Sequence, residues 1–168
     1  MQTERRRSWN ADLRVRFKEL EDRWNQLHPT ISVVDRAGNT GAALSDFGLS
    51  AETLAVLQAH RPNLLLIGPD SNLERVLHAL TPFTAAPTVS CRAGQLSLPH
   101  RLIGTLVLRA VEQLTRDEQE LMFGWMSGLP IRPQIITTAS IPLFPLVIRR
   151  QFSDTLFYRL NEMCVIVR

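Results

Sequence analysis

The sequence predicts an α/β domain with a five-stranded, mainly parallel sheet and helices on both faces, preceded by one amphipathic helix. Short apolar runs alternate along the chain with stretches in which apolar residues recur every three or four positions. This alternation is typical of parallel sheets, because parallel neighbours must be joined by a crossover helix. A length of 168 residues with 45% hydrophobic content also suits one folded domain with a real core.

Residues 1–30 are predicted to form the amphipathic helix, which Pro29 ends. Its apolar positions share one face: Trp9, Leu13, Phe17, Leu20, Trp24 and Leu27. One interpretation is that this face packs on the chain's own domain. Alternatively, it serves as a dimerising or signalling surface, because two tryptophans form a large apolar surface for a single helix. Residues 31–49 form a connecting segment with a possible strand at Ile31–Val34.

The α/β domain is predicted to span residues 50–168. Ser50 can cap a helix that runs to Ala59, and a second helix covers Leu73–Leu80. A capping box at 115–118 opens a third helix, whose expected core face is Leu114, Leu121, Met122, Trp125 and Met126. The expected strands are residues 63–67, 87–91, 105–108, 134–138 and 163–167, of which the first ends at a glycine, as a buried parallel strand can.

Charge and composition exclude several function classes. The net charge is only +3 and the arginines are scattered, so we expect no nucleic-acid binding. No apolar run is long enough for a membrane span, and no secretory leader is visible. Cys91 and Cys164 lack metal-ligand spacing and favour a reduced, cytoplasmic location, and the four histidines show no metal or nucleophile pattern.

The stretch Phe152-Ser-Asp-Thr-Leu-Phe-Tyr-Arg-Leu-Asn161 gives the strongest indication of a family. It resembles the F-R-E-D-L-Y-Y-R-L-N signature of the AAA+ ATPase domain in bacterial sigma-54-dependent transcription activators. The resemblance covers roughly residues 50–168 and implies a three-layer P-loop NTPase fold. It also implies positions for the nucleotide site, and these fall on unexpected residues.

The P-loop of the family falls on residues 68–75. A P-loop reads G-x-x-x-x-G-K, in which backbone N–H groups cradle phosphates and the lysine reaches the terminal ones. Here Gly68 matches the first glycine, but the second has become Leu73 and the lysine has become Glu74. Pro69 removes a backbone donor, and Asp70 adds a second negative charge. We expect this loop to repel phosphate.

The Walker B strand of the family falls on residues 104–110. The resemblance implies an aspartate for magnesium and a glutamate that activates water, but Arg109 and Ala110 occupy these positions. Because acid and base are exchanged relative to the family, we predict that Glu74 and Arg109 meet as an ion pair where phosphate and metal would otherwise bind. Alternatively, each side chain points separately into solvent.

The remaining family positions are also altered. The sigma-contacting insertion between the second and third strands is absent, and the chain ends before the helical lid and the DNA-binding domain. The sensor asparagine falls on Ser140, and the two late arginines of the family fall on Ser153 and Arg159. Arg159 could reach a neighbouring subunit's nucleotide, but a local pair with Asp154 or Glu162 is the preferred interpretation.

These observations favour a catalytically inactive sigma-54-activator-like AAA+ domain. It would bind a protein partner, an AAA+ activator or a second copy of itself, in transcription regulation or signalling. It would use no ATP, metal or other cofactor. The expected interaction surface comprises Trp9, Leu13, Trp24, Arg149 and Arg150. Two alternatives stay open: an activator that still binds ATP through an atypical site, and a structural assembly subunit.

Overall fold

The computed structural model describes Leu44, residues 47–101 and residues 103–168. All of them belong to one compact unit, Ile31–Arg168. The predicted N-terminal helix, with Trp9, Leu13 and Trp24, lies outside the described residues, as does most of the connecting segment.

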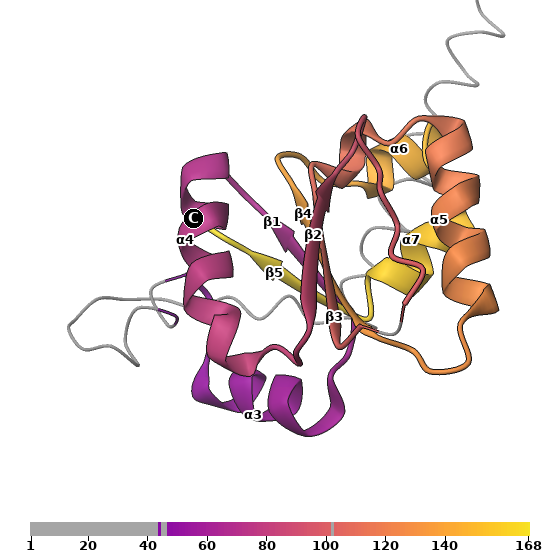
Figure 1. Cartoon of the computed structure of the whole chain (residues 1–168). Coiled ribbons are helices and arrows are strands. Elements are labelled where there is room, and N and C mark those ends of the chain that lie inside the picture. Colours follow the sequence, from indigo (N-terminus) through magenta and orange to yellow (C-terminus); the bar gives the residue numbers. More distant parts are fainter. Residues whose placement is uncertain (1–43, 45–46, 102) are drawn as a thin grey trace, which may run out of the picture. The chain divides into compact units, whose positions relative to one another are not determined.

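The predicted five-stranded sheet is present, and every strand pair in it is parallel (Figure 1). The order across the sheet is β2-β3-β4-β1-β5. The strands are β1 (Leu64–Ile67), β2 (Thr88–Arg92), β3 (Thr105–Arg109), β4 (Gln134–Ala139) and β5 (Met163–Ile166). In β1, β3 and β4 nearly every residue is buried, whereas edge strand β2 alternates between exposed and half-buried residues. Continuous burial explains why the central strands contain consecutive apolar residues and do not alternate with polar ones.

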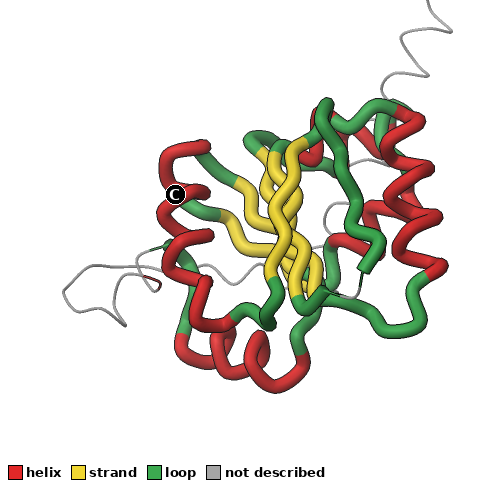
Figure 2. Tube along the Cα trace, in the orientation of Figure 1, coloured by secondary structure: helices red, strands yellow, loops and turns green. Residues whose placement is uncertain are grey.

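The helices cover both faces of the sheet (Figure 1; Figure 2). One face carries α3 (Ala51–His60) and α4 (Asp70–Leu80), and the other carries α5 (Arg116–Gly128), α6 (Phe144–Ile148) and α7 (Asp154–Leu160). The strand order requires this separation. The crossover from β1 to β2 runs toward one edge of the sheet, and the later crossovers run in the opposite direction. Because crossovers are right-handed, opposite directions place their helices on opposite faces. The 3₁₀ turns η1 (Thr81–Phe83) and η2 (Val111–Gln113) complete the connections. In the described part of the chain, no helix is long and apolar enough to cross a membrane.

The core beneath α3 and α4 includes residues that precede Ser50. Leu44, Phe47 and Leu49 are buried together with Leu57 of α3 and Val76 of α4. The described part of the connecting segment therefore contributes to the packing of this face.

Two predicted helix starts are confirmed. The Ser50 hydroxyl accepts a hydrogen bond from the Thr53 N–H and begins α3. The capping box at Thr115 and Glu118 is complete, with both reciprocal hydrogen bonds, and begins α5. Each cap satisfies an N–H group that the helix itself cannot.

Two sequence predictions about the helices are wrong. The second helix begins at Asp70, earlier than the predicted Leu73. On α5, Leu121 is 56% exposed although we expected it in the core, and Gln119 is buried instead. Gln119, Met122 and Met126 follow the spacing of one helical face, and Leu121 lies two positions from Gln119, on the far side of the helix. Trp125 is only half-buried.

Candidate functional site

The carboxyl ends of the strands form the edge at which this fold places a ligand. In open α/β sheets the binding crevice lies where neighbouring strands send their connections to opposite faces. Here that point falls between β1, which leads into α4, and β4, which leads into α6 on the other face. The loop after β1, Arg109 at the end of β3 and Ser140 after β4 all lie at this edge.

The loop after β1 has only two residues, because α4 already begins at Asp70. The Gly68 N–H donates to the Ala139 carbonyl at 3.0 Å and continues the ladder of the sheet. A Cβ on Gly68 would lie 2.3 Å from the Val167 carbonyl oxygen, so the glycine is required by the close approach of the backbone after β5. Pro69 has no N–H. This loop therefore lacks the ring of free amide donors that makes a phosphate cradle.

The two residues at the positions where the resemblance implies a P-loop glycine and lysine face different ways. Leu73 is buried in the core under α4, with 3% of its surface exposed. Glu74, the next residue on the helix, is exposed at the carboxyl edge. A leucine at this position thus packs α4 against the sheet, and the glutamate is left as the charged group that faces the edge.

The predicted ion pair between Glu74 and Arg109 is present. Arg109 Nε lies 2.7 Å from Glu74 Oε1, and Arg109 Nη2 lies 3.1 Å from Glu74 Oε2. Arg109 Nη1 also donates to the hydroxyl of Ser90 on β2. The Arg109 hydrogen bond, and more weakly the charges of Arg109 and Arg92, hold the pKa of Glu74 below its usual value, although partial burial opposes them.

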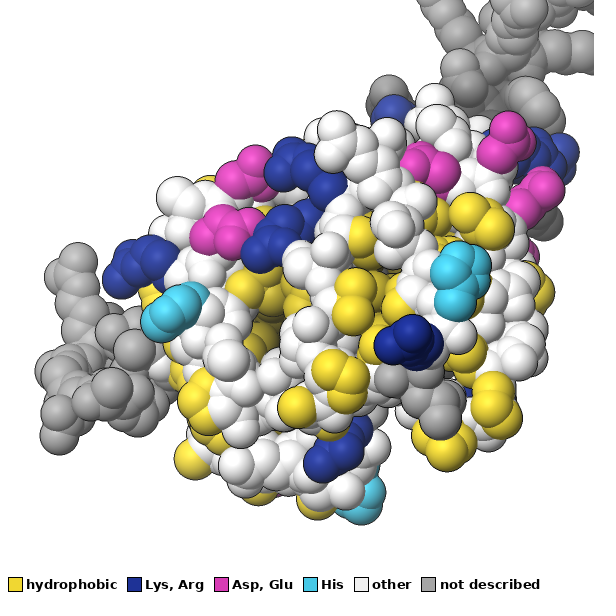
Figure 3. Space-filling view, in the orientation of Figure 1, with side chains coloured by type: hydrophobic (Ala, Val, Ile, Leu, Met, Phe, Trp, Pro, Cys, Tyr) yellow, Lys and Arg dark blue, Asp and Glu magenta, His cyan; other side chains and the backbone are white. Residues whose placement is uncertain are grey.

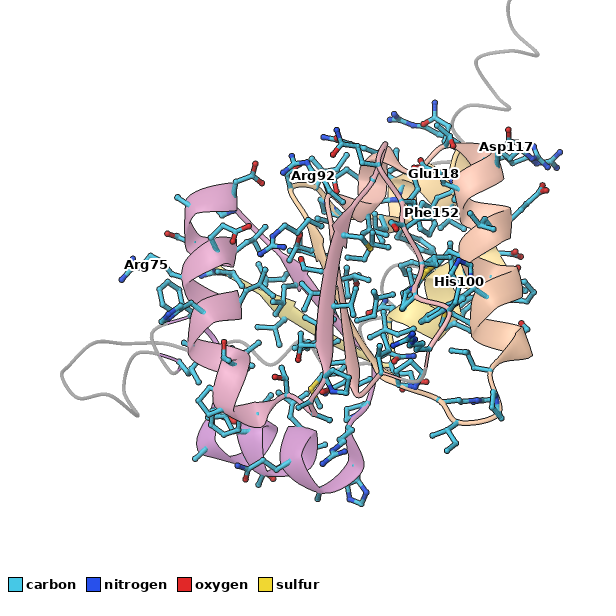
Figure 4. The ribbon with its side chains drawn as sticks, in the orientation of Figure 1. Arg75, Arg92, His100, Asp117, Glu118 and Phe152 are labelled. Carbon is cyan, nitrogen blue, oxygen red and sulfur yellow. The ribbon has the colours of Figure 1, made fainter. Side chains whose placement is uncertain are left out.

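The surroundings of this pair are mixed in charge. Acidic and basic side chains lie next to one another over the carboxyl edge and the first turn of α4 (Figure 3). Arg92 lies at the end of β2 on this edge, whereas Arg75 points away from the sheet on the outer side of α4 (Figure 4). The Arg75 guanidinium lies 4.8 Å from the centre of the Phe47 ring. The carboxyl edge therefore presents paired charges and no concentrated positive field.

Ala110 occupies the position where the resemblance implies a catalytic glutamate. Its backbone is left-handed, with φ of 54°, and its side chain is buried. Its N–H donates to the hydroxyl of Thr138 on β4 at 3.3 Å. The turn after β3 is thus anchored to the neighbouring strand, and the methyl group offers no proton acceptor.

Sequence reasoning missed one carboxylate at this edge, Glu112 on η2. Its Oε1 accepts from the Ser140 hydroxyl at 2.6 Å and from the Ser140 N–H at 3.2 Å. Its Oε2 is buried and has no hydrogen-bond partner among the described residues. An acidic residue two positions after Ala110 is visible in the sequence. The resemblance to sigma-54 activators assigns no role to this position, so it was passed over.

The connection between β2 and β3 lies where the resemblance implies a long insertion. Residues 93–101 run beside α5 and are hydrogen-bonded to it near both ends of the helix (Figure 1). The Gly94 N–H donates to Glu118 Oε1 at 2.9 Å, and Trp125 Nε1 donates to the Pro99 carbonyl at 3.0 Å. Partial burial raises the pKa of Glu118, but hydrogen bonds from Thr115 and Gly94 lower it more. The pKa of Glu118 therefore lies below its usual value. His100 lies on this connection beside α5 (Figure 4).

The late signature has structural roles in this chain. The Ser153 hydroxyl accepts from the Leu156 N–H and caps α7. Our preferred pairing of Arg159 with Asp154 or Glu162 is wrong: Arg159 Nη1 donates to the Ser127 hydroxyl at 3.0 Å, and its guanidinium lies 4.7 Å from the centre of the Phe123 ring. Within the described residues Arg159 thus contacts α5 and forms an ion pair with neither carboxylate. Arg149 and Arg150 are both exposed after α6.

Comparison with solved structures shows the class of fold. NtrX from Brucella abortus in complex with ATP is 18% identical, with a TM-score of 0.57 over 95% of this chain and 44% of that one. The ADP complex of NtrX is 16% identical, with a TM-score of 0.58 over 89% and 40%. The P-loop NTPase domain of a sigma-54 activator from E. coli is 19% identical, with a TM-score of 0.51 over 68% and 90%.

The chain therefore has the P-loop NTPase fold, and its fold is similar to that of the sigma-54 activator domain among these structures. This confirms the fold that the late signature and the strand pattern predicted. The chain spans less than half the length of the NtrX chains that it matches. No protein-family profile matches the sequence. No curated protein matches it either.

Proposed function

We propose that this chain is an AAA+-type domain that does not hydrolyse ATP and that acts by binding a protein partner in transcription regulation or signalling. Its place would be the cytoplasm, in keeping with the free thiols of Cys91 and Cys164. The observation that carries the proposal is the Arg109–Glu74 ion pair at the switch point of the sheet. It occupies the edge at which a P-loop NTPase holds phosphate and metal.

Three features at this edge oppose catalysis. The short loop after β1 offers few free N–H groups, because Gly68 bonds to Ala139 and Pro69 has none. The guanidinium of Arg109 would repel a magnesium ion, and Glu74 would repel phosphate. Ala110 cannot orient a water molecule. Phosphoryl transfer depends on positioned cations and an oriented nucleophile, and these positions supply neither.

A partner is supported by the exposed surface of the α6 region. Arg149 and Arg150 lie next to each other after α6 and are exposed. Ile141, just before α6, is 45% exposed, and exposed apolar and arginine side chains are both found in protein interfaces. The partner would be an active AAA+ domain of the same fold or a second copy of this chain.

One observation favours the alternative of an ATP-using activator with an atypical site. Glu112 brings a carboxylate to the carboxyl edge, close to the sensor position Ser140, with Oε2 unpaired. If Glu112 served as the water-orienting group, the chain would hydrolyse ATP and the Glu112→Gln variant would not.

Phosphate release with ATP and magnesium separates the two functions. We expect no turnover above the buffer rate from the wild type or from Glu112→Gln. Turnover by the wild type that Glu112→Gln abolishes would contradict our proposal. The partner role is measured by adding the chain to an active sigma-54 activator from the same bacterium. We expect a changed ATPase rate, and a smaller change with the double variant Arg149→Glu, Arg150→Glu.

A further inference from the structure

A cavity of about 490 Å³ lies at the amino edge of the sheet, the end opposite the Arg109–Glu74 pair. Its walls come from four separate segments: residues 60–63 at the end of α3, 103–104 before β3, 126–135 between α5 and β4, and 159–162 at the end of α7. These segments lie at one end of the sheet (Figure 1). The volume falls within the range of small-molecule sites, about 300–1,000 Å³.

The cavity is lined by more positive than negative charge. Arg61, Arg132 and Arg159 line it, and Glu162 is the one carboxylate among its lining residues. Within the described part of the chain, none of these three arginines takes part in an ion pair. Unpaired guanidinium groups around one cavity favour an anionic ligand, and their planar fork matches phosphate oxygens.

Arg159 is held in place before any ligand binds. Its guanidinium donates to the Ser127 hydroxyl at 3.0 Å and lies on the Phe123 ring. Its carbonyl accepts from Asn63 Nδ2 at 2.7 Å. Because most of its five N–H donors are not used by these contacts, it can bind an anion without first losing much side-chain freedom.

The wall of the cavity also contains an unsatisfied polar group. Gln134 is 4% exposed, and its Oε1 has no hydrogen-bond partner among the described residues. A buried acceptor without a partner is costly, and a ligand that donates to it would remove that cost. Met126 and Ile135 line the same cavity and offer apolar surface to a ring.

We propose that this cavity binds a small phosphorylated molecule with a ring that carries an N–H or O–H donor, a class that nucleoside monophosphates represent. The arginines would bind the phosphate, the apolar side chains would contact the ring, and Gln134 would accept from its donor. The site is separate from the carboxyl edge, so it does not depend on whether the domain hydrolyses ATP.

Titration calorimetry on the full chain without metal tests this site. The probes are the four nucleoside monophosphates, each alone, and inorganic phosphate. We expect at least one nucleotide to bind with Kd below about 1 mM and inorganic phosphate to bind more weakly. Arg132→Ala should weaken nucleotide binding at least about tenfold, the loss of one charge-assisted contact. The control Arg92→Ala, at the opposite edge of the sheet, should leave it unchanged.

Two further variants separate specific binding from a general charge effect. Glu162→Gln should tighten binding, because it removes the negative charge from the cavity while keeping an acceptor for the Asn63 N–H. Gln134→Met should weaken binding but raise the melting temperature, since it removes the unpaired acceptor. The proposal is overturned if no nucleotide binds, if inorganic phosphate binds equally well, or if Arg92→Ala weakens binding as much as Arg132→Ala.

Discussion

At the scale of single residues, Arg109 joins three elements at the carboxyl edge. It extends from β3, pairs with Glu74 on α4 and donates to Ser90 on β2. The pair is partly exposed, with side-chain exposures of 30% for Arg109 and 57% for Glu74, so water screens it. Such pairs contribute about 0–1 kcal/mol to stability. The main consequence of the Arg109–Glu74 pair is therefore that two side chains of opposite charge occupy the carboxyl edge of the sheet.

The pair makes stability depend on pH in a defined direction. Because Arg109 lowers the pKa of Glu74, this contribution is present above the usual carboxyl pKa of 4.5 and is lost as pH falls through the lower folded value. At pH 7 we expect Glu74→Gln to lower the free energy of unfolding by less than about 1 kcal/mol. Below about pH 4 the difference from wild type should shrink.

Urea unfolding of both proteins at neutral and acid pH measures this difference. Glu120→Gln is the control, because Glu120 forms an exposed pair with Arg116 at 3.7 Å on the surface of α5 and should change little at any pH. A difference for Glu74→Gln that is the same at all pH values would show that the charge of Glu74 is not responsible.

At the scale of elements, a buried glutamine holds α5 to its neighbours. Gln119 Nε2 donates to the carbonyls of Leu114 and Gln151, and its Oε1 accepts from the Ser153 N–H at 2.8 Å. The side chain thus joins α5 to the turn before it and to the α6–α7 connection. The same connection positions α7 and its Arg159.

Gln119→Leu should destabilise the domain by about 1–3 kcal/mol, because one buried and two partly buried backbone groups lose their partner while the side-chain volume changes little. Urea unfolding measures the change. Gln113→Leu, on the exposed side of η2, is the matched control and should have almost no effect. Equal effects of the two substitutions would mean that the hydrogen bonds of Gln119 do not stabilise this junction.

The sequence predicted the strands well for a physical reason. β1, β3 and β4 are almost entirely buried, so each has a run of two or more consecutive apolar residues, and their ends were placed within one or two residues. The start of α4 was misplaced because the apolar face that predicted the helix begins at Leu73, whereas the first turn, residues 70–72, is polar. Glu112 and the amino-edge cavity were missed, since their partners come from distant segments and meet only in the folded sheet.

At the scale of the described domain, the two edges of the sheet differ in charge. At the carboxyl edge Arg109 and Glu74 form an ion pair at the positions where the resemblance implies a magnesium ligand and a lysine. At the amino edge three arginines line a cavity with one carboxylate. The unpaired arginines of our proposed anion site thus lie at the end of the sheet opposite the Arg109–Glu74 pair.

Titration calorimetry with ATP and magnesium tests the central claim, that the carboxyl edge does not bind this nucleotide. The Arg132→Ala protein is used, so that the amino-edge cavity does not contribute. For this protein we predict no heat of binding up to about 1 mM ligand. We predict the same result when Glu74→Lys and Arg109→Asp are added to it, since the short loop after β1 still lacks a phosphate cradle. Magnesium-dependent binding by Arg132→Ala with its original Glu74 and Arg109 would contradict the account.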